Sequence, residues 1–163
     1  VQTCALPISL GQGLSLGLGM AMGLRMDGKD NRVYVLVGDG EMDEGQIWEA
    51  VMAAGYYKVD HLCAIIDNNG LQAQGPIKER MDVTPIGDKL AAFGWNVIEI
   101  DGHNMEEILT ALDAADTCQG KPTAIVAHTV KGKGVSFAEN VTGCHNVALT
   151  EAQYHQALEE LSK

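Results

Sequence analysis

Two short polar stretches carry the residue types that bind a hard metal ion. Gly38-Asp39-Gly40 directly follows one apolar run, and Asn68-Asn69-Gly70 follows a second run about thirty residues later. A carboxylate and an amide oxygen suit Mg²⁺ or Ca²⁺ rather than Zn²⁺, and Mg²⁺ commonly completes its coordination with phosphate oxygens and water. Gly38 and Gly40 let the backbone approach a bulky anion. Together the stretches predict a metal ion that binds a phosphate group, whereas Gly38-Asp39-Gly40 alone would also fit a tight turn.

Acidic residues are crowded in the first stretch, where Asp39, Glu41, Asp43 and Glu44 place four carboxylates within six positions. Because these carboxylates repel one another, they form either a solvated turn or the surroundings of a cation. A helix is expected directly afterwards, and its N-terminus adds a positive partial charge to the site. Asp43 and Gln46, three residues apart, are typical of a capping box at the start of that helix.

Strands and helices alternate along the sequence in a way that brings the two stretches together. We expect strands at 33–37, 62–66, 95–100 and 123–128, and helices at 10–26, 41–58, 86–93, 105–116 and 150–163. Asn104 with Glu107, and Thr150 with Gln153, mark two of the helix starts. Strands separated by helices of this length imply βαβ units. The predicted fold is therefore α/β, a parallel sheet flanked by helices, in which ligands bind at the carboxyl ends of the strands.

The composition is that of a globular chain with a strong negative charge. Its 163 residues are 46% hydrophobic and 20% charged, enough for one compact α/β domain with a core. The formal net charge of −11 argues against nucleic acid or an anionic membrane as the main partner. An anionic ligand would need a metal ion or helix N-termini to hold it. The four cysteines, at 4, 63, 118 and 144, form no C-x-x-C pair, which favours free thiols in the cytoplasm.

A glycine-rich apolar segment at 10–24 precedes the first strand. It holds five glycines and Gln12, and it is too short to cross a membrane. Gly13 and Gly17, or Gly19 and Gly23, are four residues apart, a spacing that lets another helix approach closely. A membrane helix dimer uses the same spacing. Because of the length and the glycine content, we expect a packed helix at the interface of a soluble protein.

The first eight residues, VQTCALPI, resemble the translation of a common sequencing-adapter oligonucleotide. If they are adapter-derived, residues 1–8 are not biological and the gene was cut off upstream. We therefore expect a single domain at 9–163 that is incomplete at its N-terminus. No linker, internal repeat or low-complexity segment interrupts this range.

Four longer stretches resemble transketolase, an enzyme family that uses thiamine diphosphate. They are GDGEMDEGQIWEA (38–50), DNNGLQAQG (67–75), FGWNVIEIDGHN (93–104) and AHTVKGKGVSF (127–137). The resemblance covers 9–163 and is to the N-terminal, diphosphate-binding half, in the form that two genes encode. It implies a thiamine-diphosphate-binding fold and two cofactors, thiamine diphosphate and Mg²⁺.

The resemblance also implies roles for individual residues. Asp39 and Asn69 would bind Mg²⁺ through their side chains, and Leu71 would bind it through its carbonyl oxygen. Gly40 would contact the diphosphate, while the segment from Ser9 to Gly11 would pack on the ring nearest to the diphosphate. The complete cofactor-binding set is Ser9, Leu10, Gly11, Gly38, Asp39, Gly40, Glu41, Asn69, Leu71 and His145. Glu41 and Asp43 would otherwise be solvated or capping residues.

Two further residues take roles from the resemblance. Glu44 matches a glutamate at the subunit interface, and His145 matches a histidine that lies near the diphosphate and the substrate. His145 would donate a hydrogen bond to substrate or move a proton, although Asn146 replaces the usual glycine of that motif and a surface histidine in a loop is the alternative. For His103 and His128 we favour capping or core positions over catalysis.

The expected activity is transfer of a two-carbon ketol unit between sugar phosphates. The resemblance implies that a C-terminal partner subunit carries the pyrimidine-binding half, that this chain alone is inactive, and that the assembly is a dimer of heterodimers. An exposed apolar face is expected for that reason. The alternatives are a deoxyxylulose-phosphate synthase-like enzyme, a ketoacid dehydrogenase first component, or a non-catalytic Mg²⁺-binding domain. A nucleotide-binding domain would show G-x-G-x-x-G or G-x-x-x-x-G-K-[ST] after the first strand, and neither is present.

Overall fold

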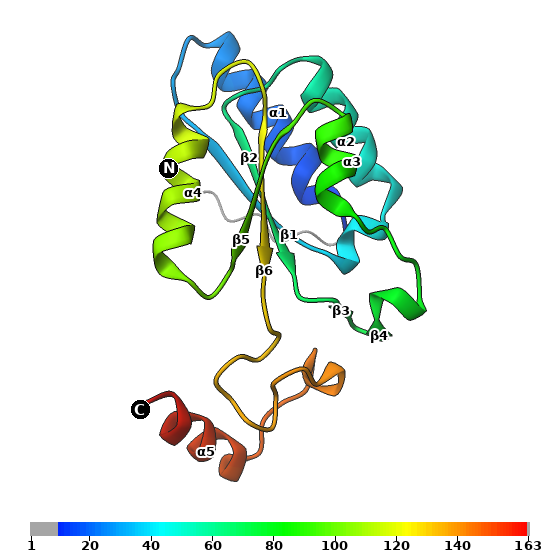
Figure 1. The fold of residues 1–163 in the computed structure, drawn as a ribbon, viewed down its shortest axis with the longest axis vertical. Helices are drawn as coiled ribbons and strands as arrows, with labels where there is room; N and C mark the ends of the chain where they lie inside the picture. Colours follow the sequence, from blue (N-terminus) through cyan, green and yellow to red (C-terminus); the bar gives the residue numbers. More distant parts are fainter. Residues whose placement is uncertain (1–9, 163) are drawn as a thin grey trace.

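A four-stranded parallel sheet forms the centre of the protein (Figure 1). The computed structural model describes residues 10–162, so the expected adapter-derived segment 1–8 and the role expected of Ser9 lie outside the described residues. The strands lie in the order β1 (Val33–Gly38), β2 (Leu62–Asn68), β6 (Thr123–His128) and β5 (Asn96–Asp101). All three neighbouring pairs are parallel, which confirms the predicted α/β fold.

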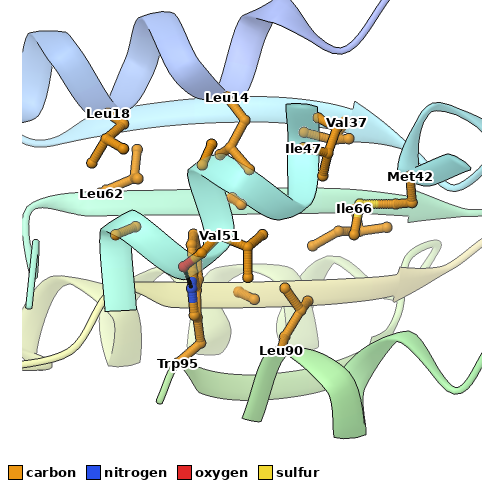
Figure 2. Packing of buried hydrophobic residues seen from close by; sticks show 14 of the residues in the cluster. Leu14, Leu18, Val37, Met42, Ile47, Val51, Leu62, Ile66, Leu90 and Trp95 are labelled. Carbon is orange, nitrogen blue, oxygen red and sulfur yellow. Dashed lines mark hydrogen bonds between the residues drawn. The ribbon is translucent and has the colours of Figure 1, made fainter. Parts of the chain in front are cut away.

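One face of the sheet is covered by three helices, α1 (Gln12–Met26), α2 (Gly45–Tyr56) and α3 (Ile86–Ala92). Leu14 and Ile47 are buried with side chains of β1 and β2, and Leu90 of α3 is buried on the β6 and β5 side of the same cluster (Figure 2). At the edge of this cluster Trp95 is buried, and its Nε1 donates a hydrogen bond to the carbonyl oxygen of Val51 at 2.9 Å. This layer fixes where β1 and β2 end.

Among the described residues, α4 (Met105–Thr117) is the one helix on the opposite face, where it packs over β5 and β6. Ala111 and Ala115 of this helix are buried with Ile100 and Ile125. Leu36, on β1, is 72% exposed, so the expected exposed apolar surface is present on this face. Within residues 10–162, no helix has the length and apolarity needed to cross a bilayer.

Helix α1 approaches the sheet closely through its glycines. A Cβ at Gly17 would lie 2.3 Å from Cγ2 of Val35, and one at Gly13 would lie 3.6 Å from Cγ1 of the same valine. The expectation of an approaching helix is therefore wrong for Gly13 and Gly17, whose neighbour is strand β1, and it stays a prediction for Gly19 and Gly23. A Cβ at Gly19 or Gly23 would meet nothing within 4 Å in the described chain.

The acidic stretch after β1 differs from the expected helix start. Instead of one helix over 41–58, a 3₁₀ helix, η1 (Gly40–Asp43), comes first, and α2 begins at Gly45. Glu44 is extended between them and is the N-cap of α2, without a side-chain hydrogen bond. The predicted capping box of Asp43 with Gln46 is therefore wrong. The other two predicted helix starts are confirmed: Asn104 is the N-cap of α4, although its backbone amide does not bond to Glu107, and Thr150 forms a complete capping box at α5 (Glu151–Leu161).

Short elements complete the described chain. They are β3 (Leu71–Gln72), β4 (Gly75–Pro76), η2 (Ile77–Glu79) and η3 (Thr142–Cys144). The strands β3 and β4 form an antiparallel pair directly after β2. The segment that follows β6, which includes η3 and α5, lies beyond the carboxyl ends of the strands (Figure 1).

Candidate functional site

The loops that follow β1 and β2 meet at the carboxyl edge of the sheet. Gly38 and Asp67 are paired in the parallel register, and the next backbone amide, of Asp39, donates to the Asp67 carbonyl oxygen at 3.1 Å. The Asp39 side chain then reaches the second loop, where its Oδ2 accepts a hydrogen bond from the Gly70 amide at 2.5 Å. The predicted meeting of the two polar stretches is confirmed.

Asp39 carries a buried carboxylate, since the residue is only 1% exposed. Burial raises the pKa of Asp39, the amides of Gly70 and Gly40 oppose that shift, and the neighbouring Asp67 carboxylate adds to it. The Gly40 amide donates to Oδ1 at 2.7 Å. Two neutral amides compensate a buried negative charge only in part, so a cation beside this carboxylate would be stabilising.

Asn69 has both ends of its side-chain amide engaged. Its Oδ1 accepts from the Leu71 amide at 2.9 Å, and its Nδ2 donates to Oδ2 of Asp67 at 3.0 Å. The other Asp67 oxygen, Oδ1, accepts a hydrogen bond from the Thr129 hydroxyl. Gly70, with φ of 76°, gives the left-handed turn that brings Leu71 into β3. The amide oxygen of Asn69 therefore lies on the side of the loop that holds Leu71.

Gly40 is required by the close approach of the two loops. A Cβ at this position would lie 2.6 Å from Cβ of Gln72 in β3. Gly38 is less crowded, since the nearest atom to a Cβ there would be Glu41 Cβ at 4.0 Å. The neighbouring β3 strand therefore excludes a side chain at Gly40, whereas Gly38 has room for a Cβ.

Glu41 makes contacts that the sequence did not predict. Its Oε1 accepts from the Gly11 amide at 2.8 Å, and its Oε2 accepts from the Gly38 amide at 3.2 Å. Gln46 adds a bond from its Nε2 to the Leu10 carbonyl oxygen at 2.6 Å. These side chains fasten the start of α1 to the loop after β1. No spacing in the sequence indicates this, because the segments that they join lie some thirty residues apart.

The remaining two acids of the stretch are arranged differently. Oδ1 of Asp43 is buried and has no hydrogen-bond partner among the described residues, and burial raises the pKa of this carboxyl. As a residue Asp43 is partly exposed, and it does not cap α2, because the N-cap of that helix is Glu44. Glu44 is partly buried, and no hydrogen bond or ion pair of its carboxylate occurs within 10–162. The interface role expected of Glu44 stays a prediction.

Within residues 10–162 none of the three histidines forms a hydrogen bond to Asp39, and Nδ1 of His128 lies 3.2 Å from Nδ2 of Asn68. His145 directly follows η3 and is exposed, and its side chain makes no hydrogen bond within the described part of the chain. His103 is exposed and accepts a hydrogen bond from the Val130 amide at its Nε2, 2.8 Å away. His128 is exposed and its Nε2 lies 3.0 Å from Glu99 Oε2. The expectation that His103 and His128 are core or capping residues is wrong, since Asn104 caps the neighbouring helix.

A groove of about 530 Å³ runs along the face of the sheet that α4 covers in part. Aliphatic side chains such as Leu36, Ile65 and Ile125 line most of it. Asp67, Thr129 and Lys131 lie at its polar end, next to the loop that holds Asn69. No group of three or more His, Cys, Asp or Glu side chains suited to a metal ion occurs in the described range. A metal here would therefore depend on mixed oxygen donors such as Asp39, Asn69 and a backbone carbonyl.

Comparisons with known proteins agree with this arrangement. The family described as "Transketolase, thiamine diphosphate binding domain" matches residues 3–162. The chain is 49% identical over 155 residues to the 6-deoxy-6-sulfo-D-fructose transketolase subunit of Clostridium sp. (strain MSTE9). It is 46% identical over 155 residues to one of the subunits of the apulose-4-phosphate transketolase of Phocaeicola vulgatus. Among solved structures, the transketolase of Campylobacter jejuni superposes with a TM-score of 0.88 at 32% identity.

These matches cover nearly all of the chain but only part of each relative. The two subunits are matched over 95% of this chain and over 56% and 55% of their own lengths. The Campylobacter jejuni structure is matched over 94% of this chain and 25% of its own. The chain thus spans about half the length of the curated relatives it matches.

Proposed function

Because the chain belongs to the transketolase family, whose thiamine diphosphate-binding domain it carries, we propose that it is the diphosphate-binding half of a transketolase. The enzyme transfers a two-carbon ketol unit from a ketose to an aldose, with thiamine diphosphate and Mg²⁺. A partner subunit supplies the pyrimidine-binding half. This chain is inactive without that partner.

The observation that carries the proposal is the bond between the Asp39 carboxylate and the Gly70 amide. It holds a buried carboxylate against the loop that contains Asn69 and Leu71, so three hard oxygen donors come from two adjoining loops. Their chemistry fits Mg²⁺, which takes its remaining ligands from phosphate and water. A Cβ at Gly40 would collide with Gln72 of β3, so glycine at this position lets the two loops approach closely.

In this proposal the residues of the chain bind and orient the two cofactors. Asp39 and Asn69 hold Mg²⁺ by their side chains and Leu71 by its carbonyl oxygen, while Gly38 and Gly40 contact the diphosphate. Glu41 acts by fastening the segment from Leu10 to Gly11, which packs on the cofactor together with Ser9. The bound cofactor supplies the nucleophilic carbon that accepts and releases the two-carbon unit. His145 donates a hydrogen bond to the substrate or moves a proton there.

The relatives indicate the class of substrate and the need for a partner. One is named for 6-deoxy-6-sulfo-D-fructose and another for apulose-4-phosphate, and both are named as subunits. Both sugars carry an anionic group, so the substrates of this chain are sugar phosphates or similarly anionic sugars. The assembly is a dimer of heterodimers in the cytoplasm, with Glu44 at the interface between subunits.

The test is cofactor binding by the complete subunit produced together with its partner subunit. Calorimetry with thiamine diphosphate and MgCl₂ should show binding that is lost with EDTA, and the pair should transfer a ketol unit between sugar phosphates. Asp39→Asn should weaken Mg²⁺-dependent binding at least about a hundredfold, because the site loses its one charged ligand. Asp113→Asn, an exposed acid on α4, is the matched control. Unchanged affinity in Asp39→Asn would overturn the metal assignment.

A further inference from the structure

Asp67 lies between the two proposed side-chain ligands without being one of them. We propose that Asp67 is a positioning residue, which holds the Asn69 amide so that its oxygen, and not its nitrogen, is presented to the metal. This inference rests on the proposed function, because it concerns the orientation of a proposed Mg²⁺ ligand. Nothing in the residue spacing assigns Asp67 a role.

Both carboxylate oxygens of Asp67 are committed to neighbouring side chains. Oδ2 accepts from Nδ2 of Asn69 at 3.0 Å, and Oδ1 accepts from the Thr129 hydroxyl. The backbone carbonyl oxygen of Asp67 accepts from the Asp39 amide at 3.1 Å. Asp67 therefore contacts one proposed ligand through its side chain and the other through its backbone. The Thr129 bond fixes the carboxylate from the loop that follows β6.

The chemistry of an amide makes this contact decisive for Asn69. The oxygen and nitrogen of the side-chain amide have nearly the same shape, so their placement is set by hydrogen bonding rather than by sterics. An ionised carboxylate accepts hydrogen bonds and donates none. A rotated Asn69 would set its oxygen against Oδ2 of Asp67, which is repulsive. The carboxylate thus favours the orientation in which Oδ1 faces away from Asp67, and the Leu71 amide, which donates to that oxygen, favours the same orientation.

Orientation of this kind matters because Mg²⁺ binds oxygen and requires near-ideal octahedral geometry. An amide nitrogen turned toward the ion would place N–H donors against a cation. Residues that orient metal ligands through hydrogen bonds typically contribute about 10–100-fold to metal affinity. We expect a loss of this size when Asp67 is removed.

A double-mutant cycle on Mg²⁺ affinity separates positioning from a general structural effect. The complete subunit with its partner is titrated with MgCl₂ at saturating thiamine diphosphate, and the calorimetric affinity is compared among Asp67→Ala, Asn69→Ala and the double variant. Asp67→Ala should weaken Mg²⁺ binding about 10–100-fold in the native background. In the Asn69→Ala background it should change the affinity by less than about threefold, because the group that it positions is gone.

The remaining outcomes are also decisive. Equal losses from Asp67→Ala in both backgrounds would show a structural role and overturn the inference. Asp67→Asn should retain affinity within about fivefold, because the Thr129 hydroxyl can accept from an amide and leave the asparagine oxygen facing Asn69. If Asp67→Ala does not fold, Thr129→Val gives the same cycle with a smaller coupling. Asp39→Asn is measured alongside, since unchanged affinity there would overturn the proposed function rather than the role of Asp67.

Discussion

Two regions at the carboxyl edge of the sheet are held in different ways. The paired loops, residues 38–44 and 67–72, are bound to each other and to the start of α1 through Asp39, Asp67 and Glu41. The C-terminal segment, residues 131–162, is bound largely to itself, as in the bonds from the Ser136 amide and hydroxyl to the Glu160 carboxylate, each 2.7 Å. Helix α5 of that segment buries none of its residues within the described chain.

The difference separates two parts of the proposed chemistry. In the paired loops the oxygen donors are in place through contacts within the chain itself, because β1 and β2 fix both loop ends. His145, in the C-terminal segment, has no side-chain bond to those loops within residues 10–162. Substitutions that change packing in the paired loops should therefore strongly weaken Mg²⁺-dependent cofactor binding. Substitution of His145 should instead mainly affect turnover of the substrate. The predictions below test that contrast.

Among substitutions that change packing rather than a proposed ligand, the largest effect is expected from Gly40→Ala. The new Cβ would lie 2.6 Å from Gln72 Cβ, so the paired loops must separate. Overpacking of this kind costs about 1–3 kcal/mol, which corresponds to a loss of cofactor affinity of up to about a hundredfold. Calorimetry with thiamine diphosphate and MgCl₂ measures it. Gly45→Ala, whose Cβ would meet nothing within 4 Å, is the matched control and should bind normally. Equal affinities in the two variants would contradict the packing argument.

A smaller effect is expected from Glu41→Ala. The change leaves the amides of Gly11 and Gly38 without their acceptor, at a cost of about 2 kcal/mol in the free energy of unfolding. Urea unfolding of the variant measures it. Glu44→Ala, which removes a carboxylate without a partner in the described residues, should change the stability by less than about 0.5 kcal/mol. It should instead weaken assembly with the partner subunit, as sedimentation would show. Similar destabilisation in both variants would contradict the assignment of Glu41.

The fold and part of the site follow from sequence, for identifiable physical reasons. Apolar strands that alternate with helices predicted the parallel sheet, and the sheet geometry then predicted that Asp39 and Asn69 lie on adjoining loops. The helix starts at Asn104 and Thr150 were predicted because their partners lie three residues away. Local patterns of this kind are visible in the sequence.

Contacts between distant residues were not predicted. The Asp43 capping box failed because Asp39 already starts a 3₁₀ turn, so the helix begins later, at Gly45. The bonds of Glu41 to Gly11 and of Asp67 to Thr129 join groups that are 30 and 62 residues apart. Gly17 faces strand β1 rather than a helix for the same reason, since a glycine spacing does not specify which element approaches.

His145→Ala should have a moderate effect that is confined to turnover. The side chain is exposed, so the free energy of unfolding and the Mg²⁺-dependent cofactor affinity should be unchanged. Loss of a hydrogen bond to an anionic or transferring group should lower kcat/KM for ketol transfer about tenfold or more. His155→Ala, an exposed histidine on α5, is the control and should keep full activity. A drop in cofactor affinity without a drop in kcat/KM would place His145 with the paired loops instead.

The smallest effect is expected from chemical modification, in which Cys63 and Cys144 report on the two regions. Burial in β2 raises the pKa of Cys63 to about 12 from an ordinary value of 9.0, so at pH 9 it is almost entirely the unreactive thiol. Cys144, beside His145, is only partly buried. At pH 9, iodoacetamide should therefore modify the partly buried Cys144 and leave Cys63 unmodified, as peptide mass spectrometry would show. In the unfolded chain both cysteines react. Above about pH 9 the Cys63 thiol loses its proton in the unfolded state but not in the folded state, so the contribution of this thiol to the free energy of unfolding falls as the pH rises. Rapid modification of Cys63 in the native protein would mean that the strand beneath the paired loops opens as readily as the C-terminal segment, and the contrast between the two regions would be lost.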